Sequence, residues 1–372
     1  MPLLRSVEAW DSDEARMGWA WTRTQAPTVY RVQAWPCAVL GKDVQSVTGC
    51  FVGDRLTALS VVFLDSGAWF GFVPDDEVKG VEAARGAEFA RLFREVSQGV
   101  AKEMESLAGK GREISLGATT WLRQKAEIYT HGGLGFRLTI VPDQLVKLSV
   151  FREAADASSL LTAARRSPDK QTQGRAFASL VRKSPNGDTV IDGVPVFPQG
   201  DRAYCGVSAL AMAMRLCGLM LDTEEYAAAA GIRFGSTRKS HIREVYEAAA
   251  TEAGLSMPRT DRFDFARART SIDAGFPAIV FRRWSQERDY VHTMFARRFA
   301  GDPSAELPRP DANDQKQWPT RDSYAHASIV NGYNAQRREV IFTESWSELA
   351  RNRRMRFEEL ERTSYLAYYP RL

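Results

Sequence analysis

Residues 197–218 read FPQGDRAYCGVSALAMAMRLCG, and this stretch decides how the second half of the chain is organised. Gln199 lies six residues before Cys205, within a turn-like Pro-Gln-Gly-Asp segment. From Cys205 to Leu216 the chain is rich in Ala, Leu and Met, which favour helix. Gly218 suits the position that follows a helix. We therefore predict a helix whose first turn contains Cys205.

A cysteine in the first turn of a helix lies near backbone N–H groups that lack helical partners, and these favour negative charge. A free cysteine has a pKa of about 8.5, and such surroundings lower it. Because the thiolate is the attacking form, Cys205 is a candidate nucleophile. Attack on a carbonyl produces an oxyanion, which the Cys205 N–H and the Gln199 side-chain amide are placed to stabilise.

A second stretch supplies a base. His326 begins the run HASIVNGY, and residues 339–344 alternate in the manner of a strand. A hairpin joined near residues 334–338 brings the start of its first strand beside the end of its second, which places His326 next to Glu344. A carboxylate beside a histidine fixes its tautomer and stabilises the imidazolium. We expect Trp346 to shield this contact from water.

At these residues the chain resembles the papain-like cysteine peptidases, and most closely their bacterial C39-like branch, typified by peptidases that process double-glycine leaders. The matching segments are VPVFPQ (194–199), YCG (204–206), GFPAIV (275–280), His326, GY (332–333) and ESW (344–346). The resemblance covers roughly residues 190–370. It implies that Gln199 is the oxyanion-hole glutamine, Cys205 the nucleophile and His326 the base. Glu344 falls where the family usually has Asn or Asp, so the strand or the rotamer must adjust for one more methylene.

This resemblance implies a papain-like domain in which a helical part carries the cysteine and an antiparallel sheet carries the histidine. The leading functional hypothesis is a cysteine peptidase that hydrolyses a peptide or amide bond of a peptide or protein substrate through a thioester. Two alternatives stay open. One is a transglutaminase-like acyltransferase that uses the same thiol chemistry, and the other is a non-catalytic module that binds a peptide.

Other polar residues have simpler interpretations. We expect Cys217 and Tyr204 to be core residues. Three histidines are expected in solvent, His131 in a hairpin turn and His241 and His292 on the surfaces of helices. The remaining set is interpreted as turn residues or a solvated cleft rim: Asp201, Asp322 and the basic run Arg351–Arg356. No histidine shows metal-ligand spacing, so no metal or cofactor is predicted.

Composition sets further bounds. The chain has 372 residues and a net charge of +4 from 50 basic and 46 acidic residues, which is too balanced to indicate nucleic-acid binding. No apolar stretch approaches the length of a membrane span. No signal peptide is visible, so a cytoplasmic protein and an exported one that has lost its leader are both open. Four cysteines make no disulfide framework, although Cys37 and Cys50 are spaced to face each other across a hairpin. The oligomeric state is not indicated.

We predict an α+β protein with an N-terminal domain at 1–152, a helix and linker at 153–193 and the papain-like domain at 194–372. The first domain is expected to be an antiparallel sheet crossed by a long helix, Val81–Leu107, with a strand at Ala68–Val73. A helix is expected at Ala154–Arg166 and a linker at Ser167–Gly193. The long loop Gly301–Thr320 is expected to be a lid or a substrate-binding flap.

Overall fold

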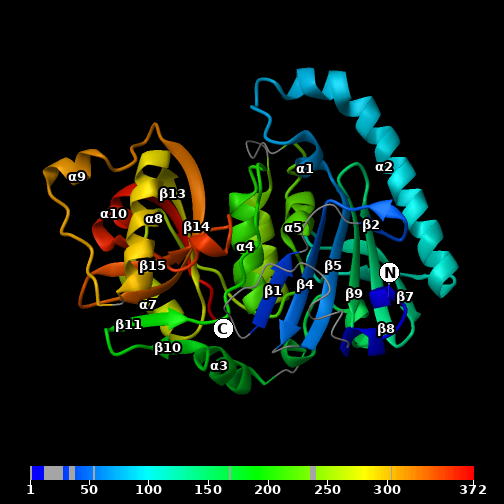
Figure 1. Cartoon of the computed structure of the whole chain (residues 1–372), viewed down its shortest axis with the longest axis horizontal. Coiled ribbons are helices and arrows are strands. Elements are labelled where there is room, and N and C mark those ends of the chain that lie inside the picture. The colour runs from blue at the N-terminus through cyan, green and yellow to red at the C-terminus, as the bar shows by residue number, and fades with distance from the viewer. Residues whose placement is uncertain are drawn as a thin grey trace. The chain divides into compact units, whose positions relative to one another are not determined.

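The computed structural model describes residues 2–11, 28–32, 38–52, 55–166, 169–234, 240–302 and 304–372. The chain divides into two compact units. Unit 1 comprises Met1–Arg166, Gly200–Tyr204 and Gly218–Glu252, and unit 2 comprises Ser167–Gln199, Cys205–Cys217 and Ala253–Leu372. Each unit combines an antiparallel sheet with helices, which confirms the predicted α+β class (Figure 1). The domain limits 1–152, 153–193 and 194–372 stay a prediction.

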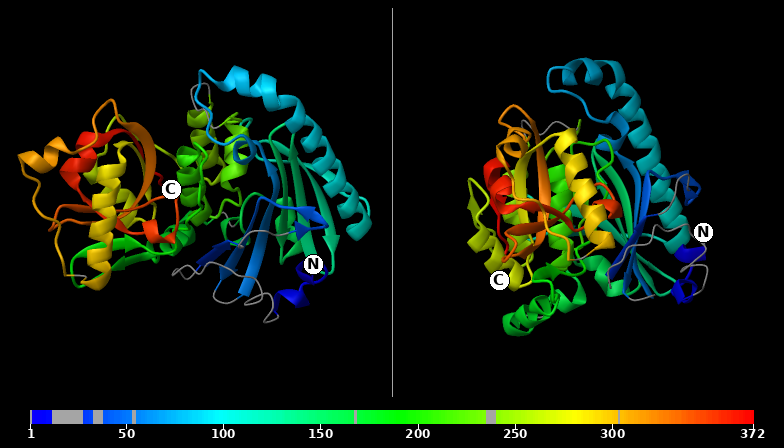
Figure 2. Two further views of the ribbon diagram at one scale, coloured as in Figure 1. Left: turned by 45° about the horizontal axis from the view of Figure 1, so that its top comes forward. Right: turned by 60° about the vertical axis from the view of Figure 1, so that its left-hand side comes forward.

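Unit 1 is built on a seven-stranded sheet in the order β1-β4-β5-β9-β8-β7-β6, in which every neighbouring pair is antiparallel. Its strands are β1 Thr28–Val32, β4 Ser46–Val52, β5 Arg55–Asp65, β6 Arg112–Leu116, β7 Gln124–His131, β8 Leu134–Val141 and β9 Leu145–Phe151, and a small hairpin pairs β2 Ala38–Val39 with β3 Lys42–Asp43. The helices are α1 Ser66–Phe70, α2 Val78–Ala108, α5 Thr223–Ala229 and α6 Ile242–Glu252, with the 3₁₀ helices η1 Pro2–Leu4, η2 Glu8–Asp11, η4 Ala154–Ser158 and η5 Ala163–Arg165. The long helix α2 lies along the sheet and contacts β3, β5, β7 and β9, as predicted (Figure 2).

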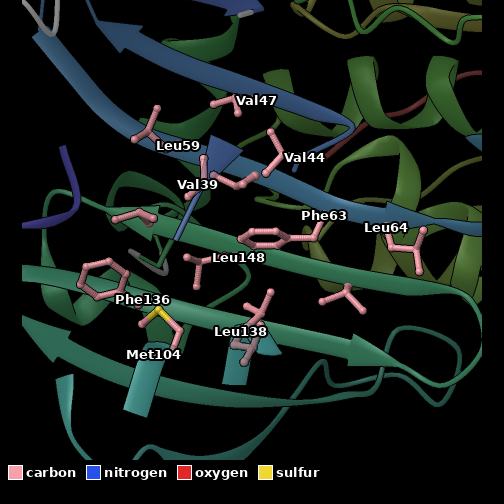
Figure 3. Packing of buried hydrophobic residues seen from close by; sticks show 14 of the residues in the cluster. Val39, Val44, Val47, Leu59, Phe63, Leu64, Met104, Phe136, Leu138 and Leu148 are labelled. Atoms are coloured by element: carbon pink, nitrogen blue, oxygen red, sulfur yellow. The ribbon is translucent and has the colours of Figure 1, made fainter. Parts of the chain in front are cut away.

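Alternation along the strands separates the two faces of this sheet. In β9, Val146, Leu148 and Val150 belong to the apolar cluster that contains Phe89 and Met104 of α2 (Figure 3). The residues between them are Lys147 and Ser149, which therefore point to the opposite face. Truncating one large apolar residue of this core to alanine costs about 2–5 kcal/mol.

The opposite face of the sheet is polar but buried. Lys147 is 1 % exposed and forms ion pairs with Asp222, at 2.7 Å, and Glu225. Asp222 and Glu225 also form the capping box that begins α5, which packs against β9. Arg137 donates to the backbone carbonyls of Ser159 and Met220, each at 2.9 Å. The buried cations thus have the partners that low-dielectric surroundings require.

Unit 2 is built on an eight-stranded sheet in the order β10-β11-β14-β13-β17-β12, with β15 and β16 continuing from β14. The strands are β10 Val181–Lys183, β11 Asp188–Ile191, β12 Arg259–Thr260, β13 Ala278–Trp284, β14 Tyr324–Asn334, β15 Glu339–Thr343, β16 Arg353–Arg356 and β17 Ser364–Tyr368. The helices are α3 Lys170–Ala178, α4 Cys205–Leu216, α7 Phe265–Asp273, α8 Gln286–Gly301, α9 Ala312–Lys316 and α10 Phe357–Thr363, with the 3₁₀ helix η6 Glu348–Ala350. Helix α4 packs against β13 and β14, α7 against β14, and α8 against β16.

The two segments that the sequence singled out have the predicted local structure. Helix α4 begins at Cys205, and Gly218 follows its end with a φ of 81°. Strands β14 and β15 form the expected hairpin, and its register shifts between Val330 and Gly332. A Cβ at Gly332 would lie 2.6 Å from the carbonyl oxygen of Thr189 in β11, so only glycine allows this close approach of the two strands.

Three expectations about local structure are wrong. Ala68–Val73 is not a strand, because the Asp65 carboxylate accepts from the Ala68 N–H at 2.8 Å and caps the helix α1. Ala154–Arg166 is not one helix but the short η4 and η5, since Leu161 between them pairs with Leu219 in an antiparallel bridge. The segment Ser167–Gly193 is not merely a linker. It contains α3, β10 and β11, and β11 pairs with β14.

The basic run Arg351–Arg356 is not a solvated turn or rim. Arg353 and Arg354 lie in β16 and are buried. Arg353 pairs with Asp289 at 2.5 Å, and Arg354 pairs with Asp188 and with Glu339, the latter at 3.2 Å. Carboxylates from distant segments therefore neutralise these guanidinium groups and allow a basic strand to enter the sheet.

The expectation of a surface position is also wrong for His292, which is fully buried. Its Nε2 lies 2.8 Å from Glu359 in α10, and Arg288 holds the same carboxylate. The loop Gly301–Thr320 is anchored to the sheet at several points: the Leu307 N–H donates to Glu339 at 2.9 Å, and Arg356 of β16 donates to the carbonyls of Leu307 and Pro308. Whether the loop acts as a lid or flap stays a prediction.

Candidate active site

Cys205 is the first residue of α4 and is half-buried. Its sulfur is hydrogen-bonded to the His326 side chain and to the backbone N–H groups of Ala327 and Gly206. The predicted position of the sulfur at a helix N-terminus is therefore combined with direct contact to the imidazole. Both residues lie in unit 2.

His326 lies near the start of β14 and is 6 % exposed. Its Nε2 is 2.8 Å from Oε2 of Glu344, although the two residues are 18 positions apart. Since Nε2 faces the carboxylate, Nδ1 is the ring nitrogen left for the sulfur of Cys205. Trp346 stacks on the imidazole with ring centroids 4.9 Å apart, which keeps water from this side of the ring.

The second oxygen of Glu344 has partners that sequence reasoning missed. Oε1 accepts from Arg282 at 2.6 Å and from the Ser328 hydroxyl at 2.8 Å. Arg282 lies directly opposite His326 in the pairing of β13 with β14, and both Arg282 and Glu344 are buried. A glutamate can therefore occupy this position because one oxygen reaches the imidazole while the other is held by a guanidinium and a hydroxyl. An arginine inside the apolar strand AIVFRRW was the available signal.

The charges of the site reinforce each other. Burial opposes ionisation of the Cys205 thiol, but its hydrogen bond to His326 and the imidazolium charge outweigh burial and lower the pKa of the thiol. Burial also disfavours the imidazolium of His326, but the Glu344 charge and the bond to Cys205 prevail and raise its pKa from 6.5 to about 9. Burial likewise opposes a charged Glu344, yet His326 and Arg282 hold its pKa well below its usual range. At neutral pH these shifts favour a thiolate beside an imidazolium.

Gln199 is tied to the same region through Ser345. The Gln199 N–H donates to the Ser345 carbonyl at 2.7 Å, and the Ser345 hydroxyl donates to Oε1 of Gln199 at 2.7 Å. Because the amide oxygen is committed to Ser345, the amide NH₂ is the end of the side chain directed away from it. Ser345 follows Glu344, so one short segment positions the Gln199 amide and the His326 imidazole together. Sequence reasoning quoted Ser345 within the ESW segment but gave it no role.

Most of the residues with simpler interpretations lie as expected. Cys217 and Tyr204 are fully buried, and the Tyr204 hydroxyl donates to Asp65 at 3.1 Å. His131 lies beside the hairpin turn that joins β7 and β8. Three further residues are exposed, namely His241, Asp201 and Asp322. Cys37 lies outside the described residues, so its pairing with Cys50 stays a prediction.

Two kinds of site are absent from the described parts of the chain. No cluster of three or more His, Cys, Asp or Glu side chains there is arranged to hold a metal ion. No helix in the same ranges is both long and apolar enough to cross a bilayer.

The antiparallel sheet with its histidine, packed against a helix that begins with the cysteine, defines a papain-like domain. Residues 191–371 match the sequence model of the Peptidase_C39 like family, which supports the predicted resemblance to the C39-like branch. Two solved structures are similar at 14 % identity. One, described as a C39-like peptidase from Bacillus anthracis, matches over 50 % of this chain and 98 % of its own, with a TM-score of 0.32. The other is the peptidase domain of Streptococcus ComA, a bifunctional ABC transporter, with 48 % and 98 % covered and a TM-score of 0.30. No curated protein matches the chain.

Proposed function

We propose that this protein is a cysteine peptidase that hydrolyses a peptide or amide bond. Cys205 is the proposed nucleophile and His326 the general acid and base, with Glu344 holding the imidazole. Gln199 and the Cys205 N–H are the proposed oxyanion donors. The observation that carries the proposal is the unbroken series of contacts from the Cys205 sulfur through the His326 ring to the Glu344 carboxylate.

The proposed reaction begins with attack of the Cys205 thiolate on the carbonyl carbon of the substrate. A carbon–sulfur bond forms, and the electron pair of the carbonyl moves to its oxygen, which accepts hydrogen bonds from the Gln199 amide and the Cys205 N–H. Collapse of this intermediate breaks the carbon–nitrogen bond, and the His326 imidazolium gives its proton to the leaving amine. The product of this half-reaction is a thioester on Cys205 and a neutral imidazole.

Water completes the proposed cycle. His326 takes one proton from a water molecule while the water oxygen attacks the thioester carbonyl. Collapse then breaks the carbon–sulfur bond, which releases the acid product and restores the thiolate beside an imidazolium. Glu344 stays ionised throughout, because Arg282 and Ser328 hold its second oxygen whatever the protonation state of His326.

The direct test uses a proteome-derived peptide library and mass spectrometry to read the cuts. We expect the wild type to cleave peptides and Cys205→Ala to leave them intact. Cys50→Ala is the matched control, since it removes a thiol from unit 1 and should leave cleavage unchanged. Equal product formation by wild type and Cys205→Ala would refute the assignment of the nucleophile.

The same material separates the remaining alternatives. Addition of a primary amine distinguishes hydrolysis, which yields only free acids, from acyl transfer, which yields amide products. Titration of the Cys205 thiol distinguishes an enzyme from a binding module. A pKa near the free-thiol value of about 8.5, together with the absence of any cleavage, would contradict the peptidase proposal.

A further inference from the structure

Unit 2 contains a cavity of about 480 Å³ whose charged lining side chains are all basic. Four basic side chains line it, namely Arg283, Lys316, Arg321 and Arg362, and none of the residues that line it is acidic. We call this the basic cavity. Within the described ranges of the chain, no carboxylate forms an ion pair with any of the four.

Several buried arginines of unit 2, by contrast, do have carboxylate partners. Arg282, Arg288 and Arg354 each pair with at least one carboxylate within 3.0 Å. The whole chain is also nearly balanced, with 50 basic and 46 acidic residues. The basic cavity is therefore a local cluster of cations without ion-paired carboxylates in the described structure, and such a cavity attracts anions.

Strand register places the basic cavity beside the candidate active site. Arg282 is paired with His326 on one side and with Ser364 on the other, and Ser364 lines the cavity. Two strand spacings, about 10 Å, therefore separate the backbone of His326 from that of Ser364. The charge of Cys205 also contributes, after burial, to raising the pKa of Tyr365, another lining residue.

The wall nearest the site is ordered. The register of β13 and β17 shifts between Phe281 and Arg282, which leaves Tyr365 as an extra residue in β17. The Arg283 guanidinium lies 4.9 Å from the Tyr365 ring centroid and donates to the Ser323 carbonyl at 3.2 Å. Arg283 is thus held at the cavity wall, one residue after the arginine that binds Glu344.

We propose that the basic cavity binds a carboxylate of the substrate and makes the enzyme selective for acidic peptides. This inference rests on the proposed peptidase function. An extended peptide advances about 3.3 Å per residue, so a span of about 10 Å places the carboxylate within about three residues of the scissile bond. Guanidinium groups suit this ligand because they bind carboxylates through two parallel hydrogen bonds. The carboxylate comes from an Asp or Glu side chain or from the C-terminus of the peptide.

The first test compares matched peptides that differ only as Glu against Gln within three positions of the cut, each with a free or an amidated C-terminus. We expect wild type to prefer the anionic member of a pair in kcat/KM. The triple variant Lys316→Gln, Arg321→Gln, Arg362→Gln should lose about tenfold on that peptide, as three partly exposed ion pairs predict, and little on the neutral one. Whether the side chain or the terminus carries the preference identifies the source of the carboxylate.

The matched control removes three cations elsewhere in unit 2, through Arg182→Gln, Arg267→Gln and Arg269→Gln. These side chains are more than half exposed, and none lines the basic cavity. The control carries the same change in net charge, so a loss confined to the first triple variant locates the effect at the cavity. An equal preference for anionic peptides in wild type and the cavity variant would overturn the proposal.

A second measurement does not depend on peptidase activity. Iodoacetate and iodoacetamide alkylate the same thiolate, but only iodoacetate is anionic. We expect the iodoacetate-to-iodoacetamide rate ratio at Cys205 to exceed that of the unfolded chain, and to fall about threefold to tenfold in the cavity variant or at high salt.

If this ratio is elevated but no peptide is cleaved, the peptidase proposal fails while the anion site stands. If peptides are cleaved but the ratio and the cleavage preference are the same in the cavity variant as in wild type, the basic cavity proposal fails alone.

Discussion

Replacement of Glu344 by glutamine removes one charge from the centre of the candidate site and leaves the shape of the side chain nearly unchanged. In the native protein the Glu344 charge is the largest favourable influence on the His326 imidazolium, opposed by burial, and the pKa of His326 rises from 6.5 to about 9. That rise corresponds to a preference for the charged ring of about 3 kcal/mol. The substitution also leaves Arg282 as a buried cation without its counter-ion near the ring.

Both effects of Glu344→Gln act in the same direction. The imidazolium loses its anionic neighbour and gains an uncompensated cation, so we expect the pKa of His326 to fall to 6.5 or below. Without the imidazolium, the Cys205 thiolate loses the interactions that oppose burial, and its pKa should return to about 8.5 or higher. At pH 6 the thiolate population, and with it the rate of alkylation, should then fall by about 100-fold or more.

The assay is the rate of iodoacetamide alkylation at Cys205 from pH 4 to 10, followed by mass spectrometry. The native imidazolium is present below about pH 9 and is lost as the pH rises through that value, so the wild type should react well below pH 8. Glu287→Gln, which changes an exposed residue of α8, is the control for the charge change. Circular dichroism checks folding. An unchanged pH profile in folded Glu344→Gln would refute the electrostatic account.

Three other substitutions test separate parts of the structure. Gln199→Ala should lower kcat by about 10²–10³ as an oxyanion donor is lost, and the rate of Cys205 alkylation should not change. Arg354→Ala removes the ion-pair partner of buried Asp188 and the nearer one of buried Glu339, and should cost about 3–5 kcal/mol of unfolding free energy in urea, whereas the exposed Arg182→Ala should cost little. Burial opposes ionisation of Glu359, but His292 and Arg288 lower its pKa from 4.5 to about 2. The ionised Glu359 therefore contributes about 3 kcal/mol to the free energy of unfolding above pH 4.5, and this contribution is lost as the pH falls toward 2. In urea unfolding, the free energy of unfolding of Glu359→Gln should decrease less than that of the wild type over this pH range.

The parts of the site that the sequence predicted are those that local pattern controls. Cys205 begins a helix because a turn precedes an unbroken run of helix-forming residues. His326 and Glu344 meet because a short hairpin brings its two strands together at their open ends. Each of these inferences needed a stretch of only about twenty residues. The catalytic roles of these residues stay proposals.

The missed partners depend on contacts between distant strands. Arg282 reaches Glu344 because β13 pairs with β14 in one register, and a shift of one residue would turn its side chain to the other face. Nothing in the pattern of β13 alone fixes that register. Ser345, the hydrogen-bond partner of Gln199, was overlooked for the same reason, since the two residues lie 146 positions apart.

The other wrong predictions concern charged or ionisable residues that were expected at the surface and are buried. Arg354 and His292 lie in charged surroundings in the sequence, and exposed positions are the usual location of such residues. Their actual partners are Asp188 and Glu359, which are 166 and 67 positions away. These residues can be buried because they form ion pairs or hydrogen bonds with carboxylates from distant segments, which meet only in the assembled domain. Composition and periodicity within each segment therefore could not reveal their burial.

The glutamate at position 344 is best understood together with Arg282. An uncharged amide would leave the thiolate and imidazolium as one neutral pair, and a lone carboxylate would add a net negative charge to a buried site. Here the order is Arg282, Glu344, His326 and Cys205, so charges of opposite sign alternate along the series of contacts. Each buried charge thereby has a neighbour of opposite sign, which is the condition under which low-dielectric surroundings tolerate ions. The departure from Asn or Asp is therefore compensated within the same sheet: Arg282 balances the added charge, and the longer side chain of Glu344 contacts both Arg282 and His326.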